Sequence, residues 1–206
     1  MFETKIYNCL YNQNLMGKKS SVHNGNLFRF YRAKEQLEIY NKTYQELSNK
    51  NACRDLVIEY TNSFLKKIGM IPVENPVRYL EGEEIDSVFF YKNIKKEAGL
   101  KSVKDIVWMK FTMEGFLGVV AVSQDINFEI PDSNDYDAVT DKNYWKYNTS
   151  GILAHKLGLE WNKSFVLIFP LQNIPSTLSR SDVECGIGNY LIEKGIPIMD
   201  YYSHKF

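Results

Sequence analysis

The chain has 206 residues, of which 44% are hydrophobic and 24% are charged. These proportions are close to those of an ordinary globular protein and exclude an intrinsically disordered chain, so we expect one globular domain over residues 1–206. The 25 basic and 25 acidic residues cancel, which argues against a dedicated nucleic-acid-binding protein, because such proteins draw most of their affinity from a basic excess.

The first predicted elements are helices. Apolar residues three and four positions apart predict an amphipathic helix over residues 33–47. A second helix follows, for which Asn49 or Asn51 is a suitable N-cap and Gly69 supplies the left-handed end. Two prolines shortly after Gly69 prevent this helix from continuing.

The middle of the chain is predicted to form strands. The segments 85–91, 106–113 and 116–123 are rich in apolar and β-branched residues. The last two are expected to form a hairpin, because Gly115 between them can adopt the positive φ of a tight turn. The polar and aromatic residues 127–149 are interpreted as a long excursion, such as a lid or a binding loop.

The C-terminal quarter predicts a strand, a helix and a second strand. Residues 164–171 form an apolar run, and Ser179 begins a helix in which Asp182 completes a capping box. Gly195 ends that helix, and the strand 196–202 follows. A βαβ unit of this kind predicts two parallel strands. The fold class is therefore α+β, with a mixed sheet, a helical N-terminal region and a C-terminal βαβ unit.

The helix over residues 179–194 is apolar on two sides. At 100° per residue, one side holds Val183, Ile187, Tyr190 and Leu191, and the other holds Cys185, Gly188 and Ile192. A helix that lies on a sheet with water behind it needs only one apolar side. We therefore expect a cover over the second side, either from this chain or from a protein partner or second copy.

We expect neither a secretory signal nor a membrane-spanning segment in this chain. Its longest apolar runs, 116–122 and 165–171, have seven residues each, whereas a span needs about 20. Cys9, Cys53 and Cys185 are odd in number and widely spaced, a pattern typical of free thiols in a reducing interior. We therefore expect a soluble, cytoplasmic protein. The abundance of Lys, Asn, Ile and Tyr is typical of AT-rich bacterial or phage genomes.

One predicted site lies where the apolar run ends and the last helix begins. Ligands of open α/β sheets bind at the carboxyl ends of strands, and the free N–H groups of a helix N-terminus favour an anion. The opposing interpretation is a capped helix with a solvated arginine, whose own acidic residues already satisfy the positive helix end. The predicted ligand-binding residues are Ser179, Arg180, Ser181, Asp182, Glu184, Asp200 and His204.

Two of these residues offer acid–base chemistry at the C-terminus. Asp200 and His204 fall on one face of the last predicted strand, and a carboxylate with an imidazole can exchange protons or hold a metal. Four residues of strand span roughly 13 Å, however, so the two touch only if the chain turns between them. The sequence therefore predicts no metal site and identifies no cofactor.

The sequence contains none of the common catalytic motifs: it has no Walker loop, GxGxxG, GxSxG or HExxH. The favoured hypothesis is a binding or interaction protein without turnover, which recognises a protein partner or a small anionic ligand. The alternative is a small hydrolase or nucleotide-processing enzyme whose polar groups converge from the C-terminal βαβ unit.

Overall fold

The architecture was established from a computed structural model, which describes residues 51–79, 105–123, 154–155, 157–196 and 198–200. The predicted helix at 33–47, the strand at 85–91 and the excursion at 127–149 lie outside these ranges. The described elements are α3 (Asn51–Lys67), β1 (Val77–Tyr79), β2 (Ile106–Phe111), β3 (Leu117–Ser123), β4 (Phe165–Pro170), α6 (Arg180–Glu193) and β5 (Ile198–Asp200).

The described strands form one mixed sheet in the order β1-β4-β2-β3-β5. The strands β1 and β4, β4 and β2, and β2 and β3 pair antiparallel, whereas β3 and β5 pair parallel. The strands β4 and β5 therefore run in the same direction, as the predicted βαβ unit requires, with β2 and β3 between them. The α+β class with a mixed sheet is confirmed.

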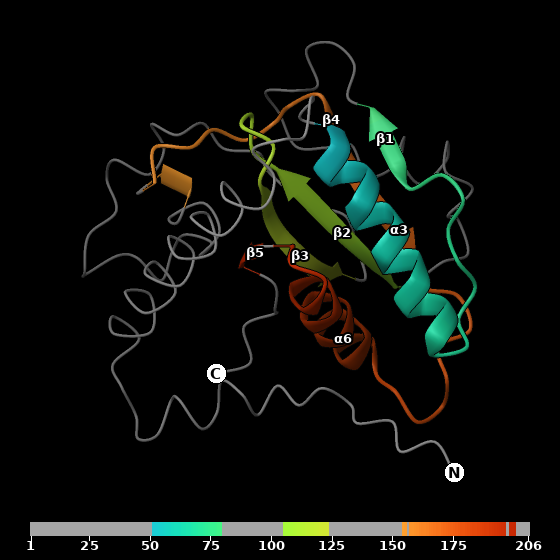
Figure 1. The fold of residues 1–206 in the computed structure, drawn as a ribbon. Coiled ribbons are helices and arrows are strands. Elements are labelled where there is room, and N and C mark those ends of the chain that lie inside the picture. The colour runs from blue at the N-terminus through green and yellow to red at the C-terminus, as the bar shows by residue number, and fades with distance from the viewer. Residues whose placement is uncertain (1–50, 80–104, 124–153, 156, 197, 201–206) are drawn as a thin grey trace, which may run out of the picture.

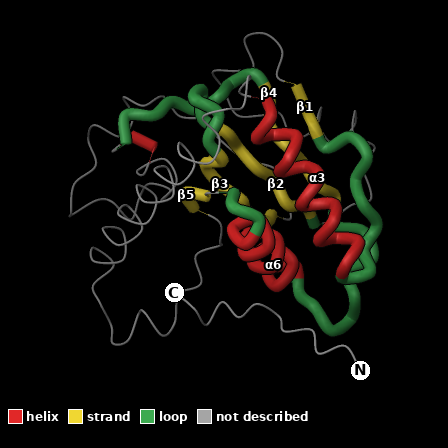
Figure 2. The backbone as a smooth tube through the Cα atoms, in the orientation of Figure 1, coloured by secondary structure: helices red, strands yellow, loops and turns green. Residues whose placement is uncertain are grey.

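The helices α3 and α6 lie side by side on one face of the sheet (Figures 1 and 2). Val183, Ile187 and Leu191 of α6 are completely buried and join one core with Leu167 and Phe169 of β4. This burial confirms the helix face that the sequence predicts for the sheet side. None of the helices in the described residues is long and apolar enough to cross a membrane.

The two helices approach closely because α6 has a glycine at the contact. A Cβ atom on Gly186 would collide with the ring of Phe64 in α3. The same ring lies 5.7 Å from the ring of Tyr190, centroid to centroid. The helix α3 thus covers the side of α6 that holds Gly186 and Tyr190, whereas a cover over the predicted second side, with Cys185, Gly188 and Ile192, stays a prediction. Association with a partner or a second copy through α6 stays a prediction.

Both helices end as their sequences indicate. Gly69 has φ 81° and Gly195 has φ 84°. After Gly69, the N–H of Met70 donates to the carbonyl of Leu65 at 2.9 Å, and after Gly195 the N–H of Ile196 donates to the carbonyl of Leu191 at 2.9 Å. These are Schellman ends, in which a left-handed glycine lets the next N–H satisfy a terminal helix carbonyl.

Candidate functional site

The predicted anion site at the start of α6 is occupied by contacts within the chain. The N–H of Asp182 donates to Ser179 Oγ at 3.2 Å. The N–H and the hydroxyl of Ser179 each donate to Asp182 Oδ2 at 2.7 Å. This arrangement is the predicted capping box, and it places a carboxylate where an anionic ligand would have to approach.

Arg180 connects the start of α6 to the start of β2. Its guanidinium donates to Asp105 Oδ1 at 3.0 Å, and the two side chains are 35% and 29% exposed. The backbone of Asp105 in turn accepts a hydrogen bond from the N–H of Leu171, just after β4. Arg180 therefore stabilises the end of the sheet at which β4 ends and β2 begins.

Glu184, in the first half of α6, is buried between this helix and β3. Its side chain is completely buried, and one carboxylate oxygen accepts a hydrogen bond from the N–H of Val122 in β3 at 3.1 Å. Ser181, three residues earlier in α6, is partly exposed. Glu184 thus fixes α6 to β3, which is a structural contact whether or not a ligand also binds nearby.

Within the described residues, the remaining predicted site residues do not lie at this end of the sheet. Asp200 pairs with Val119 in the middle of β3. Val119 lies four residues before the strand end at Ser123, a separation of roughly 13 Å along a strand. His204 lies outside the described residues. Ligand binding by the predicted set, and the alternative enzyme that would use it, stay predictions.

We expect Arg180→Ala to lower the free energy of unfolding by about 1 kcal/mol at most, because a partly exposed ion pair contributes little. Asp105→Ala should cause a similar loss, and the double variant should lose less than the sum of the two, since both single changes remove the same bond. Urea unfolding of the three variants measures this coupling. A ten- to hundredfold loss of anion affinity in Arg180→Ala, with stability unchanged, would instead establish Arg180 as a ligand-binding residue.

A second polar group, the ammonium of Lys110, lies on the face of the sheet opposite α3 and α6. Lys110, in the central strand β2, is only 2% exposed. Its Nζ atom lies 4.3 Å from the ring centroid of Trp161 and 5.5 Å from that of Trp108. Burial lowers the pKa of the Lys110 ammonium from 10.5 to about 8, because the charged form loses its hydration.

Trp161 is held over Lys110 by the backbone around it. Trp161 forms an antiparallel bridge with Thr112, just beyond β2. On either side of it, Met113 N–H donates to the Glu160 carbonyl at 2.7 Å, and Asn162 N–H donates to the Phe111 carbonyl at 2.8 Å. The backbone of Trp161 is therefore held beside the end of β2, and its indole lies 4.3 Å from the Lys110 Nζ atom, centroid to atom.

A glycine in β3 makes room for this indole. A Cβ atom on Gly118 would collide with the ring of Trp161. Buried Met199 of β5 and Ala154 cluster with the same tryptophan. Lys110 and Trp161 therefore lie in a packed apolar region, which we call the Lys110 site: Trp108, Lys110, Gly118, Trp161 and Met199.

The described part of the chain offers the Lys110 ammonium no countercharge. Among the described residues, no ion pair or hydrogen bond to the Lys110 ammonium is found, and its contacts there are with the faces of the two indoles. A cation over an indole gains about 0.5–2 kcal/mol, whereas burying an ion costs several kcal/mol. Within the same ranges, no group of three or more His, Cys, Asp or Glu is placed to hold a metal ion.

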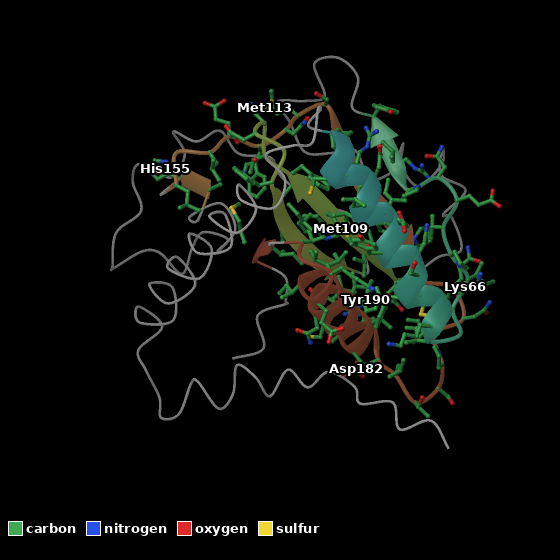
Figure 3. The ribbon with its side chains drawn as sticks, viewed as in Figure 1. Lys66, Met109, Met113, His155, Asp182 and Tyr190 are labelled. Atoms are coloured by element: carbon green, nitrogen blue, oxygen red, sulfur yellow. The ribbon has the colours of Figure 1, made fainter. Side chains whose placement is uncertain are left out.

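The two regions lie at opposite ends of the sheet. Figure 3 labels Asp182 at the start of α6 and Met113 beyond the end of β2, next to the backbone that positions Trp161. Lys110 is missing from the residues that the sequence predicts for a site. The available indication was a lysine inside an otherwise apolar strand segment, two residues after Trp108 and so on the same face of the strand.

Comparison of the chain with protein-family models, with curated proteins and with solved structures found no match.

Proposed function

We propose that this protein binds a small anionic ligand through the ammonium group of Lys110, without catalytic turnover. The observation that carries the proposal is a buried cation whose polar neighbours, within the described residues, are aromatic faces. Proteins rarely bury a charge without an opposite charge or a set of hydrogen bonds. An anion at Nζ would supply both.

The surroundings of Lys110 favour a particular kind of anion. A single ammonium group matches one negative charge better than two. Trp161, Met199 and the nearby Ala154 are buried and apolar, so the body of the ligand should be apolar as well. The proposed ligand class is therefore a monocarboxylate with an aliphatic or aromatic body.

Thermal unfolding of the full chain with acetate, benzoate and inorganic phosphate tests the proposal. A ligand that binds only the native state stabilises it by RT ln(1 + [L]/Kd), or about 2.7 kcal/mol at a hundred times Kd. We expect benzoate to raise the melting temperature of the wild-type protein. The same anion should have no effect on Lys110→Met, which keeps the length of the side chain and removes its charge.

The affinity for the anion should also depend on pH. Only the protonated amine attracts an anion, and the pKa of Lys110 in the free protein is about 8. For acetate and benzoate, which are fully ionised above about pH 6, the affinity should be constant from there to pH 8 and fall by roughly tenfold for each pH unit above pH 8. If none of the three anions stabilises the protein, or if Lys110→Met responds as the wild type does, the proposed function is wrong.

A further inference from the structure

We infer that Lys110 is also a nucleophile, and that its amine condenses with a small aldehyde or ketone to form an imine. The inference rests on the placement of the group. The Lys110 side chain is buried on a central strand, and its Nζ atom lies against two indole faces and has no carboxylate within ion-pair distance among the described residues. A lysine in an apolar site without a countercharge is the usual setting of an imine-forming amine.

The protonation state of Lys110 supports this reactivity. With a pKa of about 8, about a tenth of the Lys110 side chains are neutral at pH 7. A lysine with the ordinary value near 10.4 is neutral in fewer than about one molecule in a thousand at that pH. The reactive fraction at Lys110 is therefore roughly 200-fold larger, before any difference in access is considered.

The chemistry needs only the amine and the carbonyl compound. The lone pair of neutral Nζ attacks the carbonyl carbon, and the electron pair of the C=O bond moves to oxygen. A proton passes from nitrogen to that oxygen, which gives a carbinolamine. Loss of the hydroxyl group with the remaining N–H proton releases water and forms the C=N bond, so the step is balanced without an oxidant or reductant.

Imine formation does not depend on anion binding. It uses the neutral amine and rises with pH as Lys110 loses its proton, whereas anion binding uses the ammonium and falls over the same range. The apolar surroundings also favour the product, because an imine carries no charge and burying it costs less than burying the cation.

The experiment is reductive alkylation of the full-length wild-type protein with limiting acetaldehyde and cyanoborohydride, which reduces an imine to a stable secondary amine. Peptide mapping then compares Lys110 with Lys66, an exposed lysine in the last turn of α3 (Figure 3). We expect Lys110 to be ethylated at least tenfold faster than Lys66 at pH 7.5. This preference should disappear in urea, where the site is unfolded.

Lys110→Arg is the matched variant. A guanidinium stays protonated and forms no imine. Loss of the fast-labelling site in this variant would assign the fast labelling to Lys110. If Lys110 in the wild-type protein reacts no faster than Lys66, or is protected from labelling, the inference is overturned, while the anion measurements still decide the proposed function. The wild-type comparison requires no variant to fold.

Discussion

We expect Leu191→Ala to lower the free energy of unfolding by about 2–5 kcal/mol, because the change removes buried methyl groups and leaves a cavity. Leu191 is completely buried, and it lies in the core between α6 and the sheet with Ile187 and Leu167. Its carbonyl also accepts the Schellman hydrogen bond from Ile196, so the end of α6 depends on the same turn. Urea unfolding followed by circular dichroism measures the loss.

Ile192→Ala is the matched control for this prediction. Ile192 is the next residue of the same helix, and its side chain is only partly buried against the core. Both variants place alanine in the last turn of α6, so helix propensity changes in the same direction. The Leu191 variant should lose clearly more stability than the Ile192 variant. Equal losses, or a change below about 0.5 kcal/mol at Leu191, would contradict the assignment of the buried face.

Helix ends were predictable from the sequence because they are decided locally. The capping box at the start of α6 involves residues three positions apart, and each Schellman end involves a glycine and residues within six positions. The hairpin turn is similar, since Gly115 has φ 93° between β2 and β3. Such features need no knowledge of the remaining fold.

The pairing of the strands was less predictable. The strand β1 has only three residues, and its partners in β4 lie about 90 positions further along the chain. The sequence pattern indicated the shared direction of β4 and β5, but not that β2 and β3 separate them. Strand order depends on contacts between distant segments, and hydrophobic periodicity within one segment does not report them.

The roles of the polar site residues also depend on contacts between distant segments, which the sequence does not show. Arg180 pairs with Asp105, 75 positions away, and Glu184 binds the backbone of Val122, 62 positions away. A charged residue near a helix N-terminus looks the same in sequence whether it meets a ligand or a distant part of the chain. The sequence does not indicate a role for Lys110, because its strand is otherwise apolar and only the fold shows that the lysine is buried beside Trp161.

We expect Lys110→Met to stabilise the protein at pH 7 relative to the wild type, by up to about 3 kcal/mol. The reason is the cost of the buried charge: the pKa of Lys110 falls from 10.5 to about 8 on folding, and each pKa unit corresponds to about 1.4 kcal/mol. Methionine fills nearly the same volume and makes favourable contacts with aromatic rings, so the variant should keep its packing against Trp161.

The stability difference between Lys110→Met and the wild type should vanish at high pH. Between pH 8 and 10.5, the unfolded wild-type chain binds a proton at Lys110 that the folded protein does not bind. The stability of the wild type therefore rises with pH relative to the variant through this window, and above it the lysine is neutral in both states. Denaturant unfolding of both proteins from pH 7 to pH 11 measures the convergence, and subtracting the stability of one protein from that of the other removes the titration of all other groups.

Lys66→Met, at the exposed end of α3, removes the same charge and should show no such convergence. A difference that stays constant with pH would mean that Lys110 is not buried as a cation, and the charge-based case for an anionic ligand would fall with it.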